Sequence, residues 1–156
     1  MMHVVLVEPE IPGNTGNIAR LCAATGASLH LVRPLGFSVD DKYLKRAGLD
    51  YWHLVDVHYY DSVEEVLAEY PDSPRFLLTT HAHHSYSRVH YGPDSLLIFG
   101  KESAGLPEAF RNAHEDECVR IPMVSEARSL NLANSVAIVL YEALRQNDFD
   151  LQEGTI

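Results

Sequence analysis

Short apolar segments rich in β-branched residues alternate along the chain with segments of helical spacing. The apolar segments cover residues 3–7, 29–32, 51–57, 75–80, 96–99 and 118–121. Between them, apolar residues recur every three or four positions, which is typical of helices buried on one side. Strands separated by helices form a mainly parallel sheet with helices on both faces. The sequence therefore predicts an α/β fold of this type.

The predicted helices have recognisable ends. Thr15 is expected to cap the first helix and Gly26 to end it. Asp40 or Asp41 is expected to cap a short basic helix that stops at Gly48. The remaining predicted helices span residues 63–69, 107–113 and 132–146.

Length and composition predict one domain. The chain has 156 residues, of which 46% are hydrophobic, and it shows no internal repeat or linker, so we expect a single domain over residues 1–156. The longest apolar run, residues 136–141, is far below the ~20 residues of a membrane span. The two cysteines are far apart in the sequence, which argues against a disulfide framework. We therefore expect a soluble cytoplasmic protein.

The charge is unevenly distributed. The chain carries 12 Lys and Arg against 22 Asp and Glu, a net charge of −10 that predicts weak non-specific affinity for nucleic acid. The region 20–46 nevertheless has a local net charge of +3, because its basic residues outnumber Asp40 and Asp41. These basic residues are Arg20, Arg33, Lys42, Lys45 and Arg46. The region is either ordinary solvated surface or a small basic patch on an acidic protein.

Three glycine- or asparagine-rich loops follow predicted strands. They cover residues 12–17, 100–105 and 122–131. Because the carboxyl ends of parallel strands meet at one edge of the sheet, we expect these loops to border one ligand crevice. The first loop is either a nucleotide loop or an ordinary strand-to-helix turn, since it lacks both standard phosphate-binding patterns. In the second, Lys101 is followed by Glu102, which excludes a P-loop.

Polar residues around the third loop exceed what helix capping needs. Ser129, Asn131 or Asn134 could cap the last helix, but Arg128 and the second asparagine remain. Arg20 could project toward the crevice or could lie in solvent.

The histidines and cysteines indicate no metal site. His81, His83, His84 and His90 lack a standard zinc spacing and have no nearby cysteine, so we expect a surface loop and no metal. Cys22 and Cys118 fall at apolar positions and are expected to be small buried hydrophobes.

The last predicted helix is apolar on almost every side. The expected core positions are Ala133, Val136, Ala137, Leu140, Tyr141 and Leu144. Ile138 and Val139 make the opposite side apolar as well. Such a helix is either central in the fold or covered by a partner chain, and we favour a homodimer that forms through it.

Taken in order, the three loops resemble the motifs of the SPOUT family of RNA methyltransferases. The first motif is residues 14–20 (NTGNIAR), and the second is residues 97–106 (LIFGKESAGL). The third combines residues 121–123 (IPM) with 129–134 (SLNLAN). Residues 8–17 (EPEIPGNTGN) and 46–51 (RAGLDY) are similar to minimal members that methylate the wobble nucleotide of tRNA. The resemblance covers essentially the whole chain.

This resemblance implies a fold, an activity and a cofactor site. The fold would contain a trefoil knot near the C-terminus, an exception to ordinary chain topology. The activity would be 2′-O-methylation of the wobble ribose by S-adenosylmethionine, with no metal, in a homodimer that binds tRNA. The cofactor would be held near Leu78, Gly100, Ile121, Ser129 and Leu130.

The resemblance also implies roles for individual side chains. Arg20, Ser129 and Asn131 would be catalytic, with Arg20 lying beside the partner's pocket as a general base or as a stabiliser of the alkoxide or phosphate. Glu102 would order the second loop. The tRNA backbone would be contacted by Arg33, Lys42, Lys45 and Arg46.

Two other functions stay open from the sequence. A related methyltransferase could act on ribosomal RNA or on another tRNA position. A non-catalytic nucleotide-binding or assembly protein would be expected to lack Arg20 or to have a damaged third motif, yet Arg20, Ser129 and Asn131 are all present.

Overall fold

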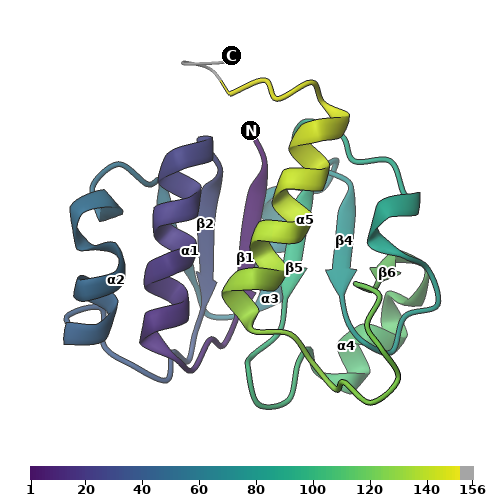
Figure 1. Cartoon of the computed structure of the whole chain (residues 1–156), viewed down its shortest axis with the longest axis horizontal. Coiled ribbons are helices and arrows are strands. Elements are labelled where there is room, and N and C mark those ends of the chain that lie inside the picture. Colours follow the sequence, from purple (N-terminus) through teal and green to yellow (C-terminus); the bar gives the residue numbers. More distant parts are fainter. Residues whose placement is uncertain (152–156) are drawn as a thin grey trace.

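The computed structural model of the chain describes residues 1–151, apart from the side chains of residues 47–50. Within this part, six strands pair into one sheet in the order β3-β2-β1-β5-β4-β6 (Figure 1). All of the strand pairs are parallel. The strands are β1 (His3–Val7), β2 (Ser28–Val32), β3 (Val57–Tyr60), β4 (Arg75–Leu78), β5 (Leu96–Phe99) and β6 (Cys118–Val119).

Helices cover both faces of this sheet, as the alternating pattern predicts. They are α1 (Pro12–Thr25), α2 (Lys42–Trp52), α3 (Val63–Glu69), α4 (Glu108–Ala113) and α5 (Leu132–Gln146). Helices α1, α2 and α5 pack on one face, and α3 and α4 pack on the other (Figure 1). The predicted fold class, a parallel α/β sheet between two helical layers, is therefore confirmed.

Every residue of β1 is buried, which explains why the strand is apolar without alternation. Val4 and Leu6 belong to the core beneath α1 and α5, whereas Val5 and Val7 belong to the core on the α3 side. Successive side chains of a strand point to opposite faces, so a sheet covered on both faces needs apolar residues at every position.

Helix α1 begins earlier than the sequence predicts. Pro12 occupies its first turn and Ile11 is the N-cap, so the prediction that Thr15 caps this helix is wrong. Thr15 is instead fully buried within the helix. Proline suits the first helical position because its fixed φ matches the helix and it has no N–H to leave unpaired. The predicted stop is confirmed, since Gly26 follows the helix with a left-handed φ of 75°.

Helix α2 is longer than predicted and β3 is displaced. Asp41 caps the helix by accepting a hydrogen bond from the backbone N–H of Tyr43 at 2.8 Å. The helix then continues past Gly48 to Trp52, so the predicted strand at 51–57 is wrong and β3 begins at Val57. A glycine within a helix costs only ~1 kcal/mol. The packing of α2 against α1, with Trp52 against the core, outweighs that cost.

The segment that follows β4 wraps around β6. On one side the backbone N–H of Thr79 donates to Val119 O at 3.0 Å. On the other side Arg120 N donates to His84 O at 2.9 Å, and Tyr86 N donates to Arg120 O at 2.8 Å. Residues 118–120 therefore lie between β4 and the loop that leaves it, and the chain then returns to α5 beside α1 (Figure 1).

The buried side of α5 is turned relative to the prediction. Val139 is fully buried and Tyr141 is 43% exposed, the reverse of what the sequence suggested, and Ala133 and Ala137 are only partly buried. The buried positions are Leu132, Val136, Val139, Leu140, Ala143 and Leu144. Because the helix is apolar on almost every side, its sequence does not fix which side faces the core.

None of the helices within residues 1–151 combines the length and the apolar character that crossing a lipid bilayer requires.

Candidate functional site

A cavity of about 600 Å³ opens at the carboxyl ends of β4, β5 and β6. All three of the expected segments contribute to its lining: Asn14 from the first, residues 100–105 from the second, and residues 128–131 from the third. The first segment is not a loop, because residues 12–17 form the start of α1, and Ile11 just before it lines the cavity too. The cavity lies in the size range of small-molecule sites. The predicted convergence of the loops at this edge of the sheet is therefore confirmed.

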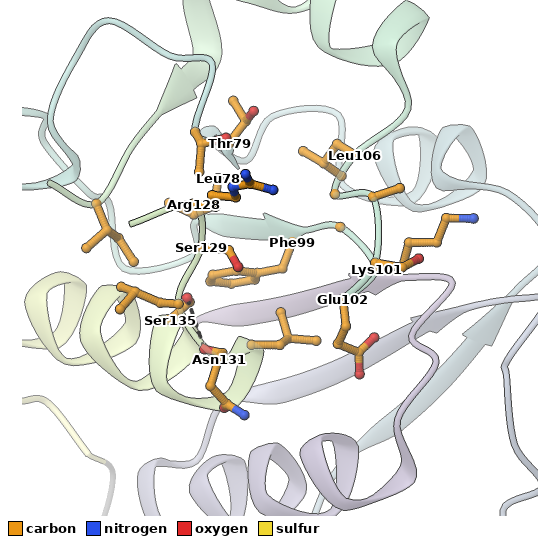
Figure 2. A pocket seen from close by; sticks show the side chains of 18 of the residues that line it. Leu78, Thr79, Phe99, Lys101, Glu102, Leu106, Arg128, Ser129, Asn131 and Ser135 are labelled. Atoms are coloured by element: carbon orange, nitrogen blue, oxygen red, sulfur yellow. Dashed lines mark hydrogen bonds between the residues drawn. The ribbon is translucent and has the colours of Figure 1, made fainter. Parts of the chain in front are cut away.

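The walls combine apolar with polar side chains. Leu78, Phe99, Leu106, Ile121 and Leu130 line the cavity. Figure 2 shows Ser129 and Asn131 on one side and Lys101, Glu102 and Leu106 on the other. Aliphatic side chains such as these can pack against a flat apolar ring, and the polar side chains can orient it.

Gly100 has no space for a side chain. A Cβ at this position would lie 2.0 Å from the carbonyl carbon of Gly105 and 2.1 Å from the nitrogen of Leu106. The loop closes on itself there, since Gly105 N donates to Lys101 O at 2.8 Å and Gly105 adopts a φ of 71°. Gly100 therefore lets the two ends of this cavity wall meet.

Glu102 fixes the second loop against residues 10–14, which agrees with the expectation that it orders this loop. Its carboxylate accepts from the backbone N–H groups of Glu10 and Ile11, both at 2.8 Å. The Nδ2 of Asn14 also donates to Glu102, at 3.2 Å. Three donors thus converge on one carboxylate at the edge of the cavity.

Asn131 joins the third loop to the same network. Its Nδ2 donates to Oδ1 of Asn14 at 3.1 Å, and its Oδ1 accepts from the backbone N–H of Asn134 at 3.2 Å. Asn131 is thus the N-cap of α5, which settles which of the polar residues performs that role. Ser135 also donates to Asn131 O at 3.2 Å (Figure 2).

The three predicted catalytic residues do not all meet at the cavity. Ser129 and Asn131 line the cavity, whereas Arg20 does not. Arg20 is exposed on α1, with its guanidinium carbon 4.9 Å from the centre of the Tyr51 ring. It lies six residues after Asn14, about 9 Å farther along the helix axis. All five predicted cofactor residues, Leu78, Gly100, Ile121, Ser129 and Leu130, line the cavity.

The predicted RNA-contacting residues lie outside the cavity. Lys42, Lys45 and Arg46 are exposed on α2. Arg33 is exposed just after β2, where it pairs with Asp61 at 3.4 Å. Because α2 follows the carboxyl end of β2, its first turn lies at the same edge of the sheet as the cavity.

The histidine-rich segment forms surface, as expected. His81, His83, His84 and His90 are all exposed, although His81 reaches the rim of the cavity. In the described part of the chain, no three His, Cys, Asp or Glu side chains are arranged to hold a metal. Cys22 and Cys118 are buried free thiols, as predicted, and burial raises the pKa of Cys22 to about 12.

Sequence reasoning did not single out Glu10 or assign a role to Asn14. Glu10 Oε1 accepts from the backbone N–H of Ser103 at 2.9 Å and from its hydroxyl at 2.7 Å. The hydroxyl of Ser103 holds the pKa of Glu10 below its usual value. The only available signal was the position of Glu10 between two prolines directly after β1, which marks a loop and no particular contact.

Comparison with known proteins gives one consistent result. Residues 1–141 match the SpoU rRNA Methylase family. A tRNA (cytidine(34)-2′-O)-methyltransferase from Methylovorus glucosotrophus is 49% identical over 150 residues, which covers 96% of this chain and 97% of that protein.

Solved structures extend this similarity to three dimensions. A structure from Bacillus anthracis is 50% identical, covers 100% of both chains and has a TM-score of 0.92. Another, which concerns 2-OH methylation of C/U34 on tRNA, is 44% identical with a TM-score of 0.89 over 95% of this chain and 97% of that chain. The SpoU methyltransferase AviRb from Streptomyces viridochromogenes, in complex with the cofactor AdoMet, is 31% identical with a TM-score of 0.77, over 94% of this chain and 57% of that one.

The likeness to SpoU structures supports the expected trefoil knot. The position of β6 between β4 and the loop that follows β4 agrees with such a knot. Sequence, fold and cavity lead to the same family. The chain belongs to the SpoU (SPOUT) methylase family and, within it, to the group of tRNA (cytidine(34)-2′-O)-methyltransferases.

Proposed function

We propose that the protein transfers a methyl group from S-adenosylmethionine to the 2′-hydroxyl of the wobble nucleotide 34, a cytidine or uridine, in tRNA. The observation that carries this proposal is the convergence of three family motifs on one cavity, in a chain that matches C34 methyltransferases over nearly its full length. Because tRNA is its substrate, we expect the protein to work in the cytoplasm.

The residues around the cavity suit S-adenosylmethionine. Leu78, Ile121 and Leu130 supply aliphatic surface for the adenine ring, and Gly100 lets the 105–106 backbone close this part of the cavity wall. We propose that Gly100 and Ser129 also contact the cofactor. The bound sulfonium compound supplies an activated methyl group, so no metal is needed for the transfer.

The protein must place the 2′-oxygen in line with the methyl carbon. As the new carbon–oxygen bond forms, the carbon–sulfur bond breaks and the hydroxyl proton passes to a base or to water. Positioning alone can lower the barrier by roughly 7–11 kcal/mol. Ser129 and Asn131 are placed to orient the ribose, since both line the cavity and Asn131 is fixed by Asn14.

Arg20 is proposed to act in the neighbouring subunit of a homodimer. It is exposed and lies outside the cavity of its own subunit. Helices α1 and α5 lie side by side on one face (Figure 1), and α5 adds the exposed Tyr141 and the partly exposed Ile138 to that face. A second copy packed there would cover this apolar surface and bring Arg20 of the partner subunit toward the cavity.

We propose that Arg20 stabilises negative charge. A guanidinium is almost always protonated in proteins, so it is a weak base but a strong donor to an oxyanion. The developing alkoxide and the adjacent phosphate both offer such oxygens.

The exposed cations beside the cavity are proposed to hold the tRNA backbone. Lys42, Lys45, Arg46 and Arg33 give the region its local positive charge, while the whole chain is acidic. Binding should therefore weaken steeply with salt and depend on the shape of the anticodon loop. We propose that the single domain over residues 1–156 carries both the cofactor site and this RNA surface.

The direct test is to incubate the purified protein with labelled S-adenosylmethionine and unmodified bulk tRNA. Nuclease digestion with mass spectrometry then locates the methyl group. We expect 2′-O-methylation at nucleotide 34. The label could instead appear only at other tRNA positions, or only in ribosomal RNA supplied in parallel. Either result would contradict nucleotide 34 as the substrate and would support a methyltransferase that acts on another RNA site. Cofactor binding without label on any RNA would favour a non-catalytic protein.

The composite site has its own test. Arg20→Ala should abolish transfer and leave the cofactor Kd nearly unchanged, whereas Asn131→Asp damages the cavity. Mixing the two variants in equal amounts allows heterodimers in which one of the two cavities is intact and faces an intact Arg20 of the partner subunit. Since about half of the dimers are then heterodimers, about a quarter of wild-type activity should return. No recovery after verified subunit exchange would show that Arg20 acts within its own subunit.

A further inference from the structure

Two loops about 90 residues apart hold each other through a reciprocal pair of glutamates. Glu102 accepts from the backbone N–H groups of Glu10 and Ile11. In return, the Glu10 side chain accepts from the backbone N–H and the hydroxyl of Ser103. We call Glu10, Ile11, Glu102 and Ser103 the glutamate clamp.

Only one oxygen of Glu10 makes the return contacts. Both hydrogen bonds from Ser103 end on Oε1, at 2.7 and 2.9 Å. A carbonyl-type oxygen has two lone pairs and can accept both. A neutral amide oxygen at this point could therefore accept the same two bonds as the carboxylate.

The segment that carries Glu10 is fixed from the opposite side as well. Gly36 N donates to Pro9 O at 2.9 Å. A Cβ on Gly36 would lie only 2.8 Å from the Cα of Glu10, so the two backbones are in direct contact. Glu8 has a φ of 56°, a left-handed conformation that non-glycine residues adopt rarely and mainly where the surroundings impose it. The backbone of residues 8–11 is thus a rigid support.

The clamp forms part of the cavity wall. Ile11, Glu102 and Ser103 all line the cavity. Without the Glu10 side chain, Ser103 would lose both of its bonds to the 8–11 segment, and of these four bonds only the two to Glu102 would remain. The Glu10 contacts therefore fix the middle of this wall.

We propose that Glu10 is a positioning residue that holds the 100–105 loop in the shape that binds S-adenosylmethionine. Glu10 acts through Ser103, and it does not itself line the cavity. This inference rests on the proposed function only for the identity of the cofactor. It requires no particular RNA substrate.

The test measures the Kd of S-adenosylmethionine by calorimetry on RNA-free protein. Glu10→Ala should weaken binding about tenfold, because part of the binding free energy must then order the loop. Glu10→Gln should stay within about twofold of wild type, since its amide oxygen can accept both bonds. Glu64→Ala, at an exposed position on α3, is the matched control and should leave the Kd unchanged.

A double-mutant cycle identifies the partner. Ser103→Ala removes the hydroxyl, and its effect should be less than additive with Glu10→Ala. Full additivity would contradict action through Ser103. An unchanged Kd in Glu10→Ala, or an equal loss in Glu10→Gln, would overturn the positioning role.

Thermal unfolding separates a local effect from a global one. The melting temperatures of unbound Glu10→Ala and wild type should agree closely, because Glu10 lies at a partly exposed loop position. A loss of cofactor affinity that merely follows unfolding of the variant would also overturn the proposal. A wild-type protein that binds the cofactor but methylates no tRNA would refute the proposed function and leave this inference standing.

Discussion

Asn131 donates a hydrogen bond to Asn14 at 3.1 Å, although 117 positions separate them in the sequence. Asn14, in the first turn of α1, in turn donates to Glu102, so the Asn14 side-chain amide connects α1 to the second and third loops of the site. The same Asn131 caps α5 through its Oδ1. A single residue thus joins the start of the last helix to the geometry of the cavity.

Substituting Asn131 should separate its two roles. Asn131→Asp keeps the capping oxygen but loses the donor to Asn14, so we expect nearly wild-type stability and at least tenfold less methylation. Asn131→Ala loses both and should also lower the free energy of unfolding by about 1 kcal/mol. Urea unfolding and initial rates check this pair. Full activity in Asn131→Asp would show that the bond to Asn14 is dispensable.

Gly100→Ala should weaken the binding of S-adenosylmethionine. The new Cβ would lie 2.0 Å from the carbonyl carbon of Gly105, so the loop must move. We expect this movement to raise the Kd of S-adenosylmethionine about tenfold or more. Gly13→Ala is the control, because its Cβ meets nothing within 4 Å and Gly13 does not line the cavity. Calorimetry on both variants is the measurement. Equal affinities would place the cofactor elsewhere.

Tyr141→Asp should shift the protein toward monomer. Tyr141 is 43% exposed on α5, and a buried, unpaired carboxylate at an interface is strongly unfavourable. Tyr59→Asp tests the same change on β3, where the tyrosine is 37% exposed, and should leave the dimer intact. Sedimentation velocity distinguishes the two species. An unchanged dimer in Tyr141→Asp would exclude this part of α5 from the interface.

A buried polar cluster predicts how stability depends on pH. His3 Nδ1 lies 2.7 Å from Ser28 Oγ and 3.0 Å from Nε2 of His30, and Nδ1 of His30 lies 2.9 Å from the hydroxyl of Tyr60. Burial lowers the pKa of His30 to about 3 and lowers that of His3 in the same direction. The folded protein therefore keeps both rings neutral at neutral pH.

On unfolding, His3 and His30 become able to bind protons that they do not bind in the folded protein. An unfolded histidine titrates near 6.5, so the free energy of unfolding should be constant above that pH and fall as pH decreases from 6.5 toward 3. Each such histidine contributes up to about 1.4 kcal/mol per pH unit. Urea unfolding at pH 7.5, 6.0 and 5.0 measures the slope. His30→Gln should make it shallower, and an identical slope would contradict a neutral buried His30.

The sequence predicted the fold where local patterns and packing agree. The bounds of β1, β5, α3 and α5 were predicted to the residue, because apolar runs and capping residues mark both of their ends. The beginning of α1 and the end of α2 were wrong. At those places Pro12 and the packing of Trp52 outweighed the signals from Thr15 and Gly48.

The site could be predicted in its residues but not in all of its contacts. The glycine positions and the order of the motifs predicted where the cavity lies and that Gly100 and Ser129 line it. The role of Glu10 could not be predicted, because a glutamate in a loop is ordinarily solvated and its partner Ser103 is 93 positions away. The position of Arg20 outside the cavity likewise depends on how far α1 extends from the sheet edge.

The most direct test of the central claim uses two anticodon stem-loop RNAs that differ only at nucleotide 34. One carries the ribose 2′-hydroxyl there and the other carries a 2′-deoxyribose. With labelled S-adenosylmethionine, we expect methyl transfer to the first RNA and none to the second. Equal label in both would show that the acceptor is not the 2′-hydroxyl of the wobble nucleotide, and would contradict the proposed function.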